Sequence, residues 1–276
     1  MRIAPAFILF FVSWWLPSSA GMDPSVIIQR SVEANQRDWA AAPQFDYCAK
    51  KKTDNGTRTY EELMIEGSRY EHLVAVNDRP LSPDKQADEA KDLQKVISQR
   101  KRESPDDRRR RIAAYEAGRK RDNVLMEELA KAFHFALAGE DELDGRRVYV
   151  LHAVPRKGYK PPNRDAAVLT GMNGTLWIDQ QTFQWVKVDA HVVHPVSIGG
   201  FAARVEPGTE FNLEKMPVAS DVWQPKHFAM KARAKVLFLF SHRQQEDDTF
   251  FNYQPAGERL ACSSAPQPSA TGAVSK

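Results

Sequence analysis

Residues 171–193 alternate between apolar and polar side chains with a period of two, and this pattern constrains the fold most. Leu176 and Ile178 fall on one face of a first predicted strand. After a short polar turn, the second predicted strand has an apolar face and a polar face: Val186, Val188, Ala190 and Val192 against Lys187, Asp189 and His191. The pattern predicts two antiparallel strands of a sheet with one buried face and one solvated face.

The first twenty residues have the features of a secretion signal. Arg2 supplies a positive charge, residues 6–16 are apolar, and Ser18-Ser19-Ala20 places small residues where a signal peptidase cuts. We therefore predict cleavage between Ala20 and Gly21 and a periplasmic or secreted location. The alternative is a retained membrane anchor, but the apolar run is shorter than the ~20 residues needed to cross a bilayer.

The chain contains two cysteines, Cys48 and Cys262. An oxidising compartment favours a structural disulfide between them. The alternative is two separate thiols, because Cys262 begins a segment rich in Ser, Pro and Ala, residues 262–276, that is predicted to be a disordered tail. The sequence has no C-x-x-C motif, so a catalytic redox role is not expected.

Three helix starts share one pattern, in which a capping side chain precedes a proline at the first helical position. They are Asp23-Pro24, Ser82-Pro83 and Ser104-Pro105. The first helix is predicted to run from Pro24 to about Ala40, and its candidate buried residues are Val26, Ile27, Val32 and Trp39. The other two starts belong to a predicted helical insertion over residues 82–138.

Strand patterns lie on both sides of this insertion. Turn signals at Asp54-Asn55-Gly56 and Glu66-Gly67-Ser68 separate three strands before it. The predicted strands outside 171–193 are 45–51, 57–65, 70–76, 147–153, 198–205, 209–213, 222–235 and 236–242, with residues 250–253 closing the sheet. Many short strands and few helices indicate an α+β fold, in which helices cover one face of a long, curved antiparallel sheet.

The insertion contains a strongly basic stretch. Residues 95–121 hold eleven Lys or Arg and four Asp or Glu, including Arg108, Arg109, Arg110 and Arg111. The stretch is either a solvated helical face or a contact with anionic lipid head groups. Nucleic acid is not an expected partner, because the protein is predicted to be exported and no aromatic residues interleave the arginines.

Enzyme-like motifs are weak. His191 and His194 form an H-x-x-H pair, but residues three apart in a strand face opposite sides, so no metal site is predicted. The sequence contains no G-x-S-x-G motif. We predict no catalytic residue and no cofactor. A metal-dependent or hydrolytic enzyme, the least favoured alternative, would need both histidines to converge with a carboxylate.

The order of elements and the motif from Gly174 to Val188, which includes G-T-L-W-I-D and W-V-K-V, resemble the periplasmic lipoprotein-carrier superfamily, the LolA/LolB-like proteins. This group includes outer-membrane lipoprotein-sorting proteins. The similarity covers most of Asp23 to Tyr253. It implies one domain over residues 21–261, an unclosed β-barrel whose concave face is capped by helices and holds acyl chains.

We therefore expect a non-enzymatic, exported protein that binds a lipid or the acyl part of a lipoprotein. The candidate groove residues are Leu176, Ile178, Val186, Val188, Phe228, Met230, Phe238 and Phe240. The same residues would serve equally well as ordinary core. The alternative function is an envelope interaction or sensor protein that has this fold and binds no lipid.

Overall fold

The structure is a computed structural model that describes residues 22–198, 203–236 and 240–262. The predicted signal sequence and nearly all of the predicted tail lie outside these residues, so cleavage after Ala20 and the 262–276 tail remain predictions. Phe238 also lies outside them, and the side chain of Phe240 is not described.

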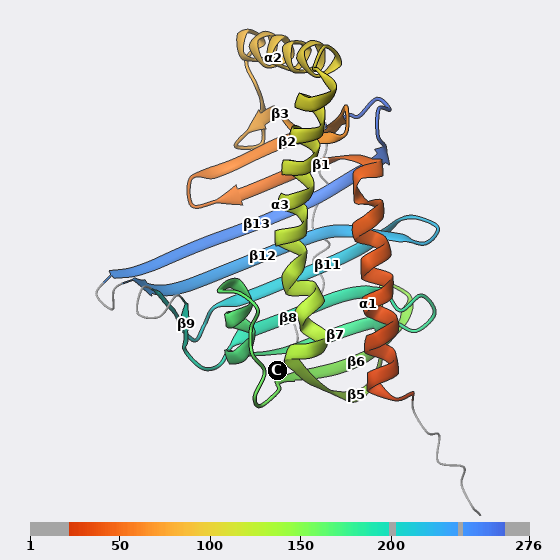
Figure 1. Ribbon diagram of the computed structural model, residues 1–276, viewed down its shortest axis with the longest axis vertical. Helices are drawn as coiled ribbons and strands as arrows, with labels where there is room; N and C mark the ends of the chain where they lie inside the picture. The colour runs from red at the N-terminus through yellow and green to blue at the C-terminus, as the bar shows by residue number, and fades with distance from the viewer. Residues whose placement is uncertain (1–21, 199–202, 237–239, 263–276) are drawn as a thin grey trace, which may run out of the picture.

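The described chain forms one thirteen-stranded antiparallel sheet that does not close into a barrel (Figure 1). Eleven strands follow one path in the order β4-β3-β2-β1-β13-β12-β11-β8-β7-β6-β5, and β9 and β10 branch from β12. The strands are β1 Phe45–Thr53, β2 Gly56–Ile65, β3 Ser68–Val76, β4 Arg79–Pro80, β5 Phe133–Leu143, β6 Arg146–Pro155, β7 Met172–Asp179, β8 Trp185–Val192, β9 Val196–Ile198, β10 Ala203–Val205, β11 Glu210–Ala219, β12 Val222–Val236 and β13 Phe240–Pro255. The predicted α+β class and open sheet are confirmed.

Two helices cross one face of the sheet, and a third lies at its end (Figure 1). They are α1 Pro24–Ala41, α2 Pro83–Lys101 and α3 Pro105–Ala132, with short 3₁₀ segments η1 Ala42–Gln44 and η2 Asp165–Gly171. The three predicted starts are confirmed: Asp23 accepts a hydrogen bond from the Ser25 amide at 2.8 Å, and Ser104 accepts one from the Asp107 amide at 3.2 Å. We call the face under α1 and α3 the inner face.

The buried side of α1 differs from the predicted one. Ile27 is buried as expected, but it is accompanied by Ile28, Ser31, Ala34 and Asp38, and Val26 is 39% exposed. Of the other predicted residues, Val26 is wrong, whereas Val32 packs against the core and Trp39 is half-buried. The helix instead turns the Asp38 side toward the sheet, where the Asp38 carboxylate forms an ion pair with the buried Lys215.

The predicted helical insertion over residues 82–138 extends too far toward the C-terminus. Its helices stop at Ala132, and residues 133–138 already belong to β5. Phe133, Phe135 and Leu137 pack against the core, whereas the residues between them are exposed. The sequence favours helix here because Leu129, Ala132 and Phe133 also follow helical spacing.

Three other strand predictions need correction. Residues 250–253 do not close the sheet: they belong to the sixteen-residue strand β13, which lies inside the sheet between β1 and β12. The predicted strand 198–205 is two short strands, β9 and β10. The predicted 236–242 strand is divided between the end of β12 and the start of β13.

The β7–β8 hairpin is confirmed, but its faces are not entirely as predicted. Ile178 pairs with Trp185 and Trp177 pairs with Lys187, so Val186 is an extra residue in β8. This bulge moves Val186 to the outer face, where it packs with Val148 and Trp223, while Val188 packs on the inner-face core. The expectation that Val186 and Val188 share a face is therefore wrong.

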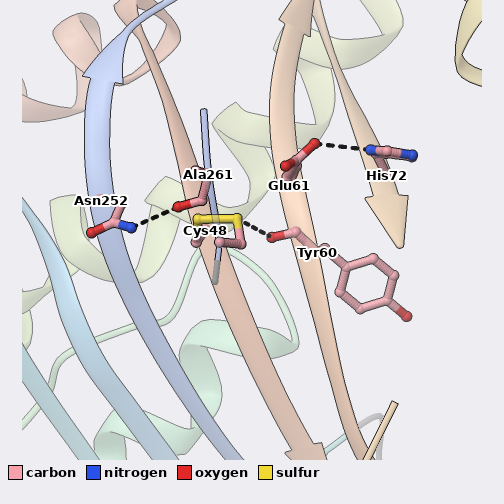
Figure 2. The surroundings of a disulfide bond; sticks show 7 residues. Cys48, Tyr60, Glu61, His72, Asn252 and Ala261 are labelled. Carbon is pink, nitrogen blue, oxygen red and sulfur yellow. Dashed lines mark hydrogen bonds and ion pairs between the residues drawn. A yellow bond between two sulfur atoms is a disulfide. The ribbon is translucent and has the colours of Figure 1, made fainter. Parts of the chain in front are cut away.

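The predicted disulfide between Cys48 and Cys262 is confirmed. It joins β1 to the segment that follows β13, with a Cα–Cα distance of 5.6 Å (Figure 2). The Asn252 side chain donates to the carbonyl oxygen of Ala261 at 2.8 Å and fixes this segment beside the sheet. Because β1 and β13 are neighbours, the disulfide connects the first strand to the segment after the last strand within the sheet.

Candidate functional site

The inner face carries a strip of apolar side chains that the helices only partly cover. Two rows of paired residues form it, because cross-strand partners point to the same face. In one row Leu213 pairs with Val188 on one side and with Phe228 on the other. In the second row Phe211 pairs with Ala190 and with Met230. We call the following six residues the apolar strip: Val188, Ala190, Phe211, Leu213, Phe228 and Met230. All six are partly exposed.

The predicted groove residues divide between this strip and other places. Val188, Phe228 and Met230 lie in the strip. Leu176 is 4% exposed and Ile178 is fully buried, so both belong to the filled core between the sheet, α1 and η2. Sequence reasoning missed Phe211 and Leu213, although both alternate with polar neighbours inside a segment that was predicted to be a strand.

Acidic residues of β13 border the apolar strip. Phe228 pairs with Asp248 and Met230 pairs with Glu246, so these carboxylates point to the inner face as well. Across the next strand boundary, Asp248 pairs with Lys51 of β1. The inner face therefore changes from apolar to charged between β12 and β13.

Lys51 links this border to a buried carboxylate of β2. Its Nζ lies 2.8 Å from Glu62 Oε1 and 2.7 Å from Glu71 Oε1. Glu62 is 2% exposed and Asp248 is 5% exposed. Glu62 Oε2 and Asp248 Oδ1 are both buried and have no hydrogen-bond partner. Two carboxylates thus each retain an unused acceptor oxygen around a single lysine.

Burial raises the pKa of both acids. It raises the pKa of Asp248 to about 7, and the neighbouring Glu246 carboxylate raises it further while Lys51 opposes the change. Burial also raises the pKa of Glu62, and the hydrogen bond from Lys51 again opposes this change. The sequence sign of this group is the acidic run 246–248, which Thr249 separates from the aromatic pair Phe250-Phe251.

Helix α3 lies over the charged end of the inner face. Tyr115 Oη of α3 lies 3.6 Å from Met64 Sδ, two residues along β2 from Glu62. The Arg69 guanidinium stacks 4.5 Å from the centre of the Tyr47 ring on the same face. One buried nitrogen of this guanidinium, Nη1, also has no hydrogen-bond partner.

Asp38 fixes α1 over the sheet. Its carboxylate forms an ion pair with the buried Lys215 of β11 and accepts hydrogen bonds from Gln184 Nε2 at 3.0 Å and the Trp223 amide at 2.9 Å. Burial lowers the pKa of Lys215, and the Asp38 charge opposes this. One side chain therefore ties α1 to β11, β12 and the turn before β8.

The four consecutive arginines have different surroundings. Arg111 lies 2.8 Å from Glu103 Oε2 and donates to Ser68 Oγ at 2.6 Å and to the Glu66 carbonyl oxygen at 3.0 Å. Arg108 lies 3.0 Å from Glu66 Oε2. These two fasten α3 to the β2–β3 turn.

Arg109 and Arg110 each form an ion pair with an acid of the first turn of α3, and both side chains are 73% exposed. A contact with an anionic surface through the arginines would thus depend on these two side chains.

The candidate metal pair does not gather ligands. His191 and His194 are both exposed at the end of β8. In the described part of the chain, we find no cluster of three or more His, Cys, Asp or Glu placed to hold a metal ion. None of the described helices is long and apolar enough to cross a membrane.

Two clefts lie away from the apolar strip. One, of about 560 Å³, is formed by the start of α1 and by β5, with Ile28, Phe133 and Phe135 among its walls. The other, of about 640 Å³, is lined by residues of β1–β3, the start of α2, Phe251 and Cys262. Figure 2 shows that His72, which pairs with Glu61 at 2.9 Å, lies near the disulfide.

Comparison with known proteins returned structural similarity only. No family model and no curated protein sequence matched the chain. Among solved structures, a DUF1329 family protein from Desulfovibrio piger matches with a TM-score of 0.32 and 11% identity, over 85% of this chain and 94% of the other. A LolA superfamily protein from Nitrosomonas europaea matches with a TM-score of 0.31 and 11% identity, again over 85% and 94%. The Pseudomonas aeruginosa MucA/MucB complex matches with a TM-score of 0.25 and 13% identity, over 85% and 99%.

One of these structures bears the name of the superfamily that the sequence resembles. At these TM-scores and identities the similarity carries no argument about what this chain binds. The apolar strip and its acidic border provide that argument instead.

Proposed function

We propose that the protein is an exported, non-enzymatic carrier that holds the acyl chain of a lipid or lipoprotein against the apolar strip. The observation that supports this proposal is the register of the strip. Six apolar side chains on three adjacent strands share one face, and all six remain partly exposed beside a filled core. Moving acyl carbons from water onto such a surface gains about 0.8 kcal/mol per CH₂ without a directional contact.

The proposal includes the domain division predicted from the sequence: a signal peptide over residues 1–20, one carrier domain over 21–261, and a tail. The proposal also assigns a membrane contact to the two exposed arginines. Arg109 and Arg110 lie on α3, which crosses the inner face, and would approach an anionic membrane surface while an acyl chain is exchanged.

The test is native mass spectrometry, with organic extraction, of protein purified from an export-competent host. We expect a stoichiometric lipid or acyl species. Phe228→Asn and Met230→Gln place polar groups in the strip and should each weaken acyl binding about tenfold. The matched control is Lys231→Gln, because Lys231 follows the strip on the same strand and its side chain is 64% exposed.

Protein that carries no lipid, and that also fails to bind fatty acid and phospholipid in a displacement assay, would contradict the proposal. The fold would then be a scaffold for protein contacts, as in the envelope interaction alternative.

A further inference from the structure

We infer that the bound amphiphile has a head group that donates hydrogen bonds and carries positive charge, such as a primary ammonium, and that Glu62 and Asp248 receive it. This inference rests on the proposed acyl binding and specifies the ligand class. The relevant geometry is one row of paired residues: Val188, Leu213 and Phe228 continue directly into Asp248 and Lys51. An acyl chain on the apolar strip would therefore place its head group beside the carboxylates.

The charged end has more acceptors than donors. The ammonium of Lys51 pairs with Glu62 and Glu71, and its charge also acts on Asp248, beside which Glu246 adds a further carboxylate. Glu62 and Asp248 are each more than nine-tenths buried, and each has one buried oxygen without a partner. Leaving such an oxygen unpaired is unfavourable, so a donor from a ligand would gain a charge-assisted hydrogen bond.

The site already holds an ammonium. Lys51 Nζ lies within 2.8 Å of Glu62 and Glu71, and its side chain is 29% exposed. Lys51 can therefore turn toward solvent with Glu71, which is 52% exposed, and leave its position to an incoming group. Burial and the neighbouring carboxylates raise the pKa of Asp248 to about 7, although the Lys51 charge opposes this change.

The buried Arg69 nitrogen without a hydrogen-bond partner would favour an anion. However, the Arg69 guanidinium stacks on Tyr47, and Arg69 pairs with Met64 near the end of β2. Asp248 adjoins the apolar strip directly, whereas Arg69 does not. A carboxylate or phosphate head group on the strip would therefore meet Asp248 and Glu246 before it reached Arg69. The arrangement therefore disfavours an amphiphile with an anionic head group.

The test compares three amphiphiles of equal chain length below their micelle concentrations: dodecylammonium, dodecanol and dodecanoate. Their binding to the full chain is measured by calorimetry at 0.15 M salt. We expect dodecylammonium to bind about tenfold more tightly than dodecanoate, with dodecanol between them. In the Glu62→Gln/Asp248→Asn variant this preference should fall to about twofold or less.

The matched control for Asp248 is Asp247→Asn, which removes one carboxylate from the neighbouring, outward-facing position of β13. It should leave the preference unchanged. Equal binding of all three amphiphiles to the unaltered protein would overturn this inference and leave the proposed function intact. So would a preference that persists in Glu62→Gln/Asp248→Asn. Binding of none of them would overturn the inference and the proposed function together.

Discussion

The ion pair between Asp38 and Lys215 should be one of the largest single contributions to stability in the chain. The two side chains are 4% and 7% exposed, so neither charge is compensated by water. Removing one partner of such a pair typically costs about 3–5 kcal/mol, because the other charge remains buried without its counterion. That is a large part of the about 5–15 kcal/mol by which a domain is stable.

We therefore expect Asp38→Asn to lower the free energy of unfolding by about 3 kcal/mol or more. The substitution keeps the shape of the side chain and an oxygen acceptor for Gln184 Nε2 and the Trp223 amide. It thus removes the charge and the hydrogen bond to Lys215, and it keeps the other two bonds. Asp38→Ala also removes that acceptor and should cost more, by about 1–3 kcal/mol for each donor left unpaired.

The double variant Asp38→Asn/Lys215→Met gives the sharpest test. It removes both charges, so its cost should be much smaller than the sum of the two single costs. Guanidinium unfolding of the oxidised protein, followed by tryptophan fluorescence and circular dichroism, measures each value. Glu140→Gln is the control, since Glu140 pairs with Arg147 at the surface and should contribute less than about 1 kcal/mol.

The pH dependence of Asp38→Asn provides a second readout. Without its counterion, the already lowered pKa of Lys215 falls further, and the unfolded state then binds more protons than the folded state. The stability of this variant should rise with pH in the range below the ordinary lysine pKa. Single costs below about 1 kcal/mol, or strictly additive costs in the double variant, would refute this account of how α1 is held.

Three further predictions concern other parts of the fold. Folding raises the pKa of Asp248 from 3.8 to about 7, so the free energy of unfolding should fall as pH rises through this window. Asp248→Asn should remove that fall and be more stable than the unaltered protein at pH 8. Urea midpoints at pH 4.5 and 8 would show both effects. Replacing Cys48 and Cys262 with Ser should cost about 2–5 kcal/mol, since the disulfide spans 214 residues; unchanged guanidinium midpoints would count against this constraint. Arg111→Met should loosen the β2–β3 turn and speed amide exchange at residues 66–68, whereas Arg110→Met should not, because its side chain is 73% exposed and bonds only within α3.

Local signals in the sequence predicted much of the fold. Proline after a capping residue located all three helix starts, and alternation together with turn residues located β1, β2, β3, β7 and β8. The errors have a physical origin in each case. Phe133 to Leu137 satisfies both helical and strand spacing, and only the pairing with β6 decides between them.

The candidate site was less predictable, because it depends on register between distant strands. A bulge at Val186 moved one candidate to the outer face, and no local pattern announces a bulge there. The acidic border exists because Asp248 lies opposite both Phe228 and Lys51, which are distant from each other in the sequence. Such pairs become visible only once the strand order is known.

Photo-crosslinking tests the proposed site of the acyl chain most directly. A fatty-chain probe with a diazirine at its midpoint would be bound to the full chain, irradiated, and mapped by peptide mass spectrometry. We predict labelling within residues 211–213 and 228–230. Labelling confined to the cleft beside Cys262, or to the cleft between α1 and β5, would contradict the assignment of the acyl chain to the apolar strip.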